Sequence, residues 1–277
     1  MLALIGVSLF RLKLAPGQEA HKRITDSWHS YGRPMNCQPH WKRLVYKCSL
    51  INQSCLLCDE PAEQHYPLCI ACEQELPWLG DHCLRCALPL PMAGLTCAQC
   101  SRRLPAFEQV IALWHFGFPV DTLISRFKHN RQWPLGRLMA ELLGHGLLHR
   151  FAEGLPRPDL LLPVPLAKRR LRARGFNQAG MLGRWLSAQL ALPCDERLLI
   201  RTRDTPAQQR LDAKARRRNL RQAFAVTNAL EGKHVAIVDD VLTTGATAQA
   251  IAQALRSAGA RRVDVYCLAR TPKPGYM

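Results

Sequence analysis

The residues best suited to bind a ligand lie in one stretch, from Val235 to Thr247. Its first four residues, Val235–Val238, are apolar and predict a short strand buried on both faces, as in a parallel sheet. Two carboxylates, Asp239 and Asp240, follow where that strand is expected to end. Adjacent carboxylates at the carboxyl end of a strand suit ribose hydroxyls, either directly or beside a magnesium ion. The stretch therefore predicts a sugar site at the edge of an α/β sheet.

A turn rich in Thr and Gly comes next and is suited to a phosphate group. It consists of Thr243, Thr244, Gly245, Ala246 and Thr247, and a helix is expected over 247–257, closed by Gly259. The first turn of a helix offers unpaired N–H groups and the positive end of the helix dipole, and Thr hydroxyls add donors. No Gly-Lys-Ser/Thr follows and no Gly-x-Gly-x-x-Gly is present. The alternative is an ordinary strand–turn–helix with solvated acids.

Cysteine spacing predicts metal binding in the first half of the chain. Four Cys-x-x-Cys pairs recur every 14 positions: Cys55/Cys58, Cys69/Cys72, Cys83/Cys86 and Cys97/Cys100. Two such pairs complete one tetrahedral zinc site, so two structural zinc sites are expected. Pairing of neighbouring Cys pairs is the simplest arrangement, and an interleaved one stays open. A redox motif would need a single Cys pair beside a βαβ unit, and a disulfide framework would need an oxidising compartment, so zinc binding is favoured over both. His65 and His82 lie near the Cys pairs and are interpreted as surface residues.

The charge balance favours polyanionic partners. The chain carries 38 Lys and Arg against 21 Asp and Glu, a net charge of +17. The densest cluster follows an apolar stretch at 160–165 and consists of Lys168, Arg169, Arg170, Arg172 and Arg174. A cluster at a strand end suits a pyrophosphate or a nucleic-acid backbone, and a merely solubilising role is the alternative. A second group, Lys128, His129, Arg131 and Arg137, is either a solvated face or an anion-binding edge.

Apolar periodicity predicts the elements that position these groups. Strands are expected at 110–114, 160–165, 198–202 and 263–268, and helices at 119–127, 134–150 and 178–191. The polar segment 203–221 is either a solvated helix or a mobile loop that closes over a ligand. We expect a flexible extension over 1–50, within which Met35 is a candidate start, a Cys-rich domain over 51–104, an α/β domain over 105–272 and a tail over 273–277. No apolar run is long enough for a membrane helix and no signal peptide is recognisable, so a cytoplasmic location is expected.

Taken together, these motifs resemble the ComF family. The resemblance covers residues 50–272 and rests on the four Cys pairs, Pro163-Val164-Pro165, Arg174-Gly175-Phe176-Asn177-Gln178, Thr205-Pro206-x-Gln208-Gln209 and the stretch from Asp239 to Thr247. It implies an α/β fold with a parallel sheet flanked by helices, like that of type I phosphoribosyltransferases, preceded by a small double zinc ribbon.

The resemblance also implies ligands and roles. Asp239 and Asp240 would contact the ribose hydroxyls of phosphoribosyl pyrophosphate (PRPP), bound with Mg²⁺, and Thr243–Thr247 would hold its 5′-phosphate. Val164, Pro165 and Leu166 match the pyrophosphate loop, and 203–221 matches the hood loop over the ligand. The family implies DNA uptake for natural transformation, with single-stranded DNA and a DNA-uptake helicase or processing protein as partners. An active phosphoribosyltransferase or PRPP hydrolase in nucleotide metabolism is the alternative, and no catalytic residue is identified.

Overall fold

The computed structural model describes residues 53–202 and 223–272, which belong to one unit spanning Leu50–Met277. The expected N-terminal extension, with Met35, Cys37 and Cys48, lies outside the described residues. The same holds for the segment 203–221, including the Thr205-Pro206 motif, and for the expected tail over 273–277.

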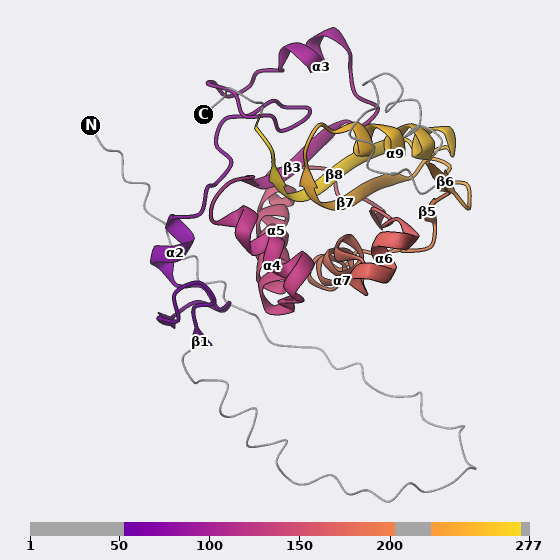
Figure 1. Ribbon diagram of the computed structural model, residues 1–277. Coiled ribbons are helices and arrows are strands. Elements are labelled where there is room, and N and C mark those ends of the chain that lie inside the picture. The colour runs from indigo at the N-terminus through magenta and orange to yellow at the C-terminus, as the bar shows by residue number, and fades with distance from the viewer. Residues whose placement is uncertain (1–52, 203–222, 273–277) are drawn as a thin grey trace, which may run out of the picture. The chain divides into compact units, whose positions relative to one another are not determined.

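A four-stranded parallel sheet forms the centre of the larger domain (Figure 1). Its order is β3 (Gln109–His115), β8 (Arg262–Arg270), β7 (His234–Leu242) and β4 (Leu160–Pro163), and every neighbouring pair is parallel. The register aligns Arg270 with both His115 and Leu242, so the three adjacent strands end at one edge. The predicted parallel sheet is confirmed, and residues that follow these strands meet at its carboxyl edge.

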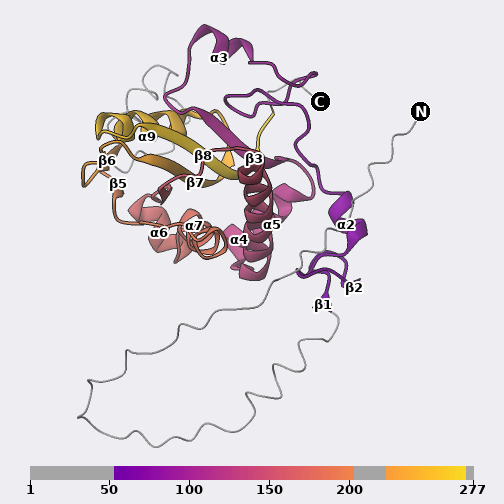
Figure 2. The same ribbon diagram turned by 180° about the vertical axis from the view of Figure 1, so that it is seen from behind.

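Helices cover both faces of the sheet. α9 (Ala246–Ser257) lies on one face, and α4 (Val120–Asn130), α5 (Trp133–Ala152) and α7 (Gln178–Leu190) lie on the other (Figures 1 and 2). Side chains alternate between the faces. Val235 and Ile237 belong to the α9 core, whereas Ala236 and Val238 belong to the core beneath α4, α5 and α7. Burial on both sides explains why this strand reads as a continuous apolar run.

Strand β7 is longer than the apolar run predicted. Its pairing with β8 continues through Asp239↔Cys267 to Leu242↔Arg270, so both acids lie inside the strand and not beyond its end. The expectation was wrong because backbone pairing does not depend on side-chain polarity. Alternation then directs the two acids to opposite faces, with Asp240 on the side of α4 and Asp239 on the side of α9.

Two further elements were not expected from the sequence. Helix α6 (Lys168–Arg174) carries the basic cluster and has no buried residue, so no apolar stripe marks it. Strand β6 (Phe224–Val226) forms a small antiparallel sheet with β5 (Leu199–Arg201).

The Cys-rich segment contains only short elements. They are β1 (Gln53–Ser54), β2 (Pro61–Ala62), α2 (Ile70–Gln74) and α3 (Ala98–Arg102). So little regular structure fits the expectation that metal supplies much of the folding free energy. Within residues 53–202 and 223–272, none of the helices combines the length and apolar character needed to cross a bilayer.

Close packing of α7 on the sheet gives a test of the fold. A Cβ added at Gly183 would lie 2.6 Å from Pro163 Cγ, a rigid ring on β4. We expect Gly183→Ala to destabilise the protein by about 1–3 kcal/mol through overpacking, measured as a shift of the urea unfolding midpoint. Gly144→Ala is the matched control, because this helix glycine faces the flexible end of Gln189. Equal midpoints for the two variants would contradict the packing described.

Candidate functional site

Asp240 is the most enclosed charge at the carboxyl edge. Its side chain is 7% exposed, and its Oδ2 lies 2.5 Å from Lys128 Nζ on α4. Its Oδ1 accepts a hydrogen bond from the N–H of Val241 at 2.7 Å. The structure thus joins an acid of the central stretch to a member of the second basic group. Lys128 stands neither on a solvated face nor at an open anion site, since a carboxylate already neutralises it.

Asp239 is half-buried and differently placed. Its Oδ1 accepts a hydrogen bond from the N–H of Asp240 at 2.9 Å, and its Oδ2 has no hydrogen-bond partner among the described residues. Burial raises the pKa of Asp239 well above its ordinary value, and the negative charge of Asp240 adds to this, against the opposing effects of the Asp240 N–H and of Lys128. Protonation of this carboxyl group, or a cation bound to it, would therefore remove an unfavourable negative charge.

The turn at Thr243–Thr247, termed the phosphate loop below, is open toward solvent. Thr243 and Thr244 are exposed, and Gly245 has φ +75°, with no atom within 4 Å of the position where a Cβ would stand. Such a φ is where glycine is favoured. Within the described part of the chain, the N–H groups of Thr243, Thr244, Gly245 and Thr247 have no hydrogen-bond acceptor. The loop therefore presents free donors at the start of α9, as an oxyanion requires.

Asn177 fixes the loop after β4, where the family resemblance places the pyrophosphate loop. Its Nδ2 donates to the carbonyl of Val164 at 3.0 Å, and the N–H of Val164 donates to the carbonyl of Val238 at 2.9 Å. These bonds attach Val164 to the turn before α7 and to β7. Pro165 and Leu166 are half-buried beside it. The Gly175-Phe176-Asn177 motif thus has a positioning role that its sequence does not reveal.

Helix α6 divides the basic cluster into an outer and an inner part. Lys168, Arg169, Arg170 and Arg172 are exposed, and none has a carboxylate within ion-pairing distance in the described ranges. Arg174 is half-buried and donates from Nη1 to Gln178 Oε1. Burial lowers the pKa of Arg174, and the carboxylate of Asp240 opposes this effect, so Arg174 belongs to the edge that holds the acids.

The eight spaced cysteines form two clusters of four. Cys55, Cys58, Cys69 and Cys72 make one cluster and Cys83, Cys86, Cys97 and Cys100 the other, with the sulfur atoms of each within 4.8 Å of one another. The simplest, sequential pairing is therefore the one observed, and neither His65 nor His82 takes part. We call residues 53–76 the first ribbon and residues 83–103 the second ribbon.

Both clusters fit zinc. Four thiolates at a Zn–S distance of about 2.3 Å stand about 3.8 Å apart in a tetrahedron. The sulfur atoms of Cys58 and Cys69 are 3.7 Å apart, as are those of Cys86 and Cys97. Backbone N–H groups also point at the sulfurs, for example that of Cys97 at Cys83 Sγ, 3.2 Å away. This donor set suits thiolates, the form that binds zinc.

The thiols of each cluster differ in the direction in which their pKa is shifted. At Cys55 and Cys83, burial opposes ionisation, but several backbone N–H groups outweigh it and lower each pKa to about 7. Burial, reinforced by neighbouring sulfurs, raises the pKa of Cys72 and Cys100. Four thiolates without a cation repel each other, and a bound Zn²⁺ supplies the compensating charge.

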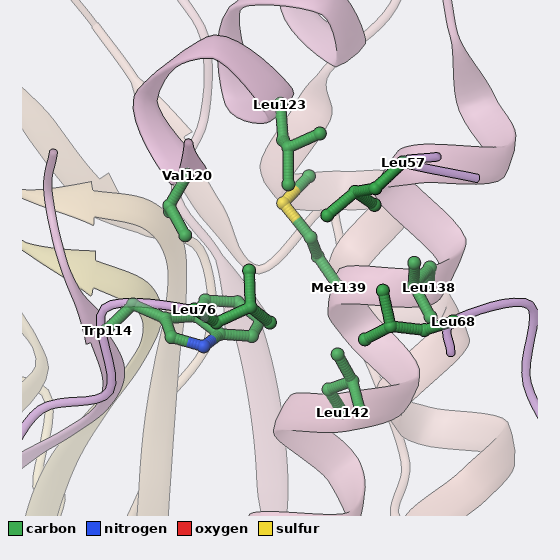
Figure 3. A pocket seen from close by; sticks show the side chains of 9 residues that line it. All are labelled: Leu57, Leu68, Leu76, Trp114, Val120, Leu123, Leu138, Met139 and Leu142. Atoms are coloured by element: carbon green, nitrogen blue, oxygen red, sulfur yellow. The ribbon is translucent and has the colours of Figure 1, made fainter. Parts of the chain in front are cut away.

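The first ribbon packs against α4, which carries Lys128, and against α5. Leu57, Leu68 and Leu76 close one side of an apolar cavity of about 10 Å³ (Figure 3). Its other side is formed by Trp114, Val120, Leu123, Leu138, Met139 and Leu142. Figure 3 shows Met139 pointing between Leu57 and Leu123. Because so little space is left between the two sides, the contact is closely packed.

Comparisons with known proteins agree with this architecture. Residues 49–101 match the double zinc ribbon domain, and residues 186–276 match the phosphoribosyl transferase domain. The chain is 40% identical to the DNA utilization protein YhgH of Escherichia coli O157:H7 over 168 residues, which cover 60% of this chain and 74% of that protein. The chain belongs to the ComF family.

A further relative and a solved structure are also similar to this chain. Competence protein F of Haemophilus influenzae is 36% identical over 170 residues, which cover 60% of this ComF chain and 74% of that protein. A purine phosphoribosyltransferase from Pyrococcus horikoshii Ot3 matches 50% of this chain and 78% of its own, with 19% identity and a TM-score of 0.34.

Sequence reasoning about this ComF chain missed three residues of the site. Lys128 was named only within an ambiguous basic group, Asn177 only within a motif, and Arg270, buried below the phosphate loop, was not named. A charged residue ending the last apolar strand was the available signal for Arg270. The pairing of Lys128 with Asp240 had no signal, because it joins distant parts of the chain.

The raised pKa of Asp239 predicts how stability depends on pH. The pKa of Asp239 in the folded protein lies above its value in the unfolded chain, so ionisation of Asp239 lowers the free energy of unfolding. This part of the stability is lost as the pH rises through the pKa of the folded protein. Asp239→Asn imitates the protonated form and should be more stable than the parent at neutral pH. The difference should shrink toward about pH 4, near the ordinary pKa of Asp. Urea unfolding at several pH values measures it.

Asp240→Asn is the matched control for this experiment. It leaves the partly buried Lys128 without its anionic partner and should destabilise the protein by about 1–3 kcal/mol at neutral pH. A variant Asp239→Asn that is as destabilised as Asp240→Asn would refute the distinction between the two acids.

Proposed function

We propose that this ComF protein binds PRPP with Mg²⁺ at the carboxyl edge of its sheet and acts in DNA uptake for natural transformation. The observation that carries the proposal is the combination of the half-buried carboxyl group of Asp239, which has no cationic partner within ion-pairing distance in the described ranges, and the N–H groups of the phosphate loop that have no acceptor there. A ribose 5-phosphate offers hydroxyls to the first and a phosphate to the second.

The donor types suit the parts of PRPP. Asp239 and Asp240 supply carboxylate oxygens for the ribose hydroxyls, and the phosphate loop supplies N–H and Thr hydroxyl donors for the 5′-phosphate. Val164, Pro165 and Leu166 lie after β4 and are proposed to border the pyrophosphate. Magnesium, when bound, would neutralise part of the pyrophosphate charge. Arg174 adds a fixed positive charge near Asp240.

Exposed cations on α6 support a nucleic-acid ligand as well. Lys168, Arg169, Arg170 and Arg172 are free of carboxylate partners in the described ranges, as a phosphate backbone requires. The relatives carry the names DNA utilization protein and competence protein, which supports single-stranded DNA as the polymer. A DNA-uptake helicase or processing protein is proposed as a further partner.

Turnover of PRPP is the second candidate function. The phosphoribosyl transferase domain match favours it. The reaction would break the bond between the anomeric carbon and pyrophosphate, and an acceptor or water would form the new bond to that carbon. Release of pyrophosphate from PRPP, measured with water alone and with nucleobase or amine acceptors, separates transfer, hydrolysis and binding without turnover.

The thiols support a reducing compartment for this protein. All eight cysteines of the two clusters are free thiols that fit zinc, and such sets persist where disulfides do not form. We therefore propose that the protein acts in the cytoplasm.

Calorimetry with PRPP and Mg²⁺ tests the first ligand. We expect saturable binding by the parent, and loss of binding in the double variant Asp239→Ala with Asp240→Ala, because the proposed ribose site then lacks both of its carboxylates. Arg102→Gln with Arg103→Gln, on exposed residues of α3 and the residue after it, should bind as the parent does. Equal affinity of the carboxylate variant and the parent would refute the site.

Fluorescence anisotropy with labelled single-stranded DNA tests the second ligand. Arg169→Gln with Arg172→Gln should lower affinity and reduce the slope of log K against log salt by about 0.7 for each phosphate that the variant no longer neutralises. Arg102→Gln with Arg103→Gln removes the same charge from the second ribbon and should have less effect. Equal losses of affinity would show that net charge, and not α6, determines binding. A salt-independent affinity would contradict the nucleic-acid interpretation.

A further inference from the structure

Arg270 connects the second ribbon with the phosphate loop. It is the last residue of β8 and is 6% exposed. Its Nη1 donates to the carbonyls of Leu242 at 3.0 Å and Thr271 at 2.7 Å, and also to that of Thr243. Its Nε donates to the carbonyl of Cys86 at 2.8 Å. One guanidinium thus bonds to the end of β7, the start of the phosphate loop and a cysteine of the second cluster.

These bonds set the orientation of the peptide groups in the loop. In a trans peptide the C=O and the following N–H point in opposite directions. Because the carbonyls of Leu242 and Thr243 face Arg270, the N–H groups of Thr243 and Thr244 face away from it. These are two of the free donors described above. Arg270 therefore directs donors outward and places a positive charge behind them.

The partners of Arg270 are all carbonyl oxygens. Within residues 53–202 and 223–272, no carboxylate lies close enough to form an ion pair with it. A buried guanidinium without a counter-ion is costly unless other groups satisfy it. An anion bound at the phosphate loop would provide the missing negative charge.

The carbonyl of Cys86 belongs to a turn that zinc would hold rigid. Cys86 Sγ lies in the second cluster, and the next residue, Ala87, has φ +53° and is fully buried. The N–H of Ala87 donates to the carbonyl of Cys83 at 2.9 Å, and Arg85 Nη1 donates to the carbonyl of Glu108 at 3.0 Å. Zinc binding would fix this turn and with it the oxygen that Arg270 contacts.

We propose that Arg270 is a positioning residue that couples zinc occupancy of the second ribbon to the shape of the phosphate loop. Loss of this zinc would release one bond of Arg270, disorder the orientation of the loop carbonyls and weaken binding of a phosphoryl ligand. No residue in contact with that ligand would change. The part that concerns ligand affinity depends on the proposed PRPP site, whereas the part that concerns loop structure does not.

The test uses the full chain labelled with ¹⁵N in Thr and Gly. Amide signals of Thr243, Thr244 and Gly245 report on the loop without any ligand, and zinc content is measured by native mass spectrometry. Cys100→Ser removes a ligand of the second cluster, and Cys72→Ser removes the corresponding ligand of the first. We expect Cys100→Ser to lose one zinc and shift or broaden the loop signals, and Cys72→Ser to lose one zinc with these signals in place.

Variants of the arginine complete the test. Arg270→Met should alter the same loop signals and weaken PRPP binding about tenfold or more, and adding Cys100→Ser to it should cause little further change. Arg270→Lys keeps the charge and replaces Arg270→Met if that variant does not fold. Arg256→Met is the control, because Arg256 also donates to backbone carbonyls, those of Ala260 and Arg261, at the other end of β8.

The outcomes separate this inference from the proposed function. Unchanged loop signals in folded Cys100→Ser that has lost one zinc would overturn the coupling, whatever its affinity for PRPP. Shifted signals in a protein that does not bind PRPP would support the coupling and refute the proposed ligand. Equal shifts in Arg256→Met and Arg270→Met would also overturn it.

Discussion

The ion pair between Lys128 and Asp240 is the contact on which the carboxyl edge depends. A carboxylate enclosed in a strand is tolerated only with a partner, and removing one member of such a pair costs more than the pair itself contributes. The partner comes from α4, so the sheet needs this helix in place. The helix packs in turn against leucines of the first ribbon. A ribbon this small has little apolar core, so zinc bound to its four thiols would also support the position of Lys128 at a distance.

Asp239 and Asp240, the two acids at the carboxyl edge, differ in their partners. Asp240 has its partners within the protein, whereas Asp239 keeps one oxygen free and has a pKa that burial raises. Within residues 53–202 and 223–272, the phosphate loop likewise has N–H groups without an acceptor, and Arg270 has no carboxylate partner. A buried acid with a raised pKa near a strand end and backbone donors without protein acceptors are not what the packing of the fold demands. Such local conflicts are expected where a ligand completes the structure.

Features that depend on the pattern of side chains could be predicted from the sequence. Features that depend on backbone pairing or on contacts between distant residues could not. Val235–Val238 reads as a buried strand because both its faces are covered, and the sequential cysteine clusters follow from spacing. The end of β7 was wrong because hydrogen bonds to β8 continue past the apolar run. Helix α6 was missed because nothing in it is buried. The role of Arg270 depends on the order of strands, which no local pattern contains.

The positively charged side chains of this protein differ in what they contact. Lys128 and Arg256 have carboxylate partners, and Arg270 bonds to carbonyls, so these three cations already bind groups of the protein itself. The outer residues of α6 have no such partners in the described ranges. Both ribbons, in contrast, contact the larger domain through leucines or a backbone carbonyl. The outer part of α6 therefore carries four exposed cations that are available to a polyanion, whereas the observed contacts of the ribbons are made with the larger domain.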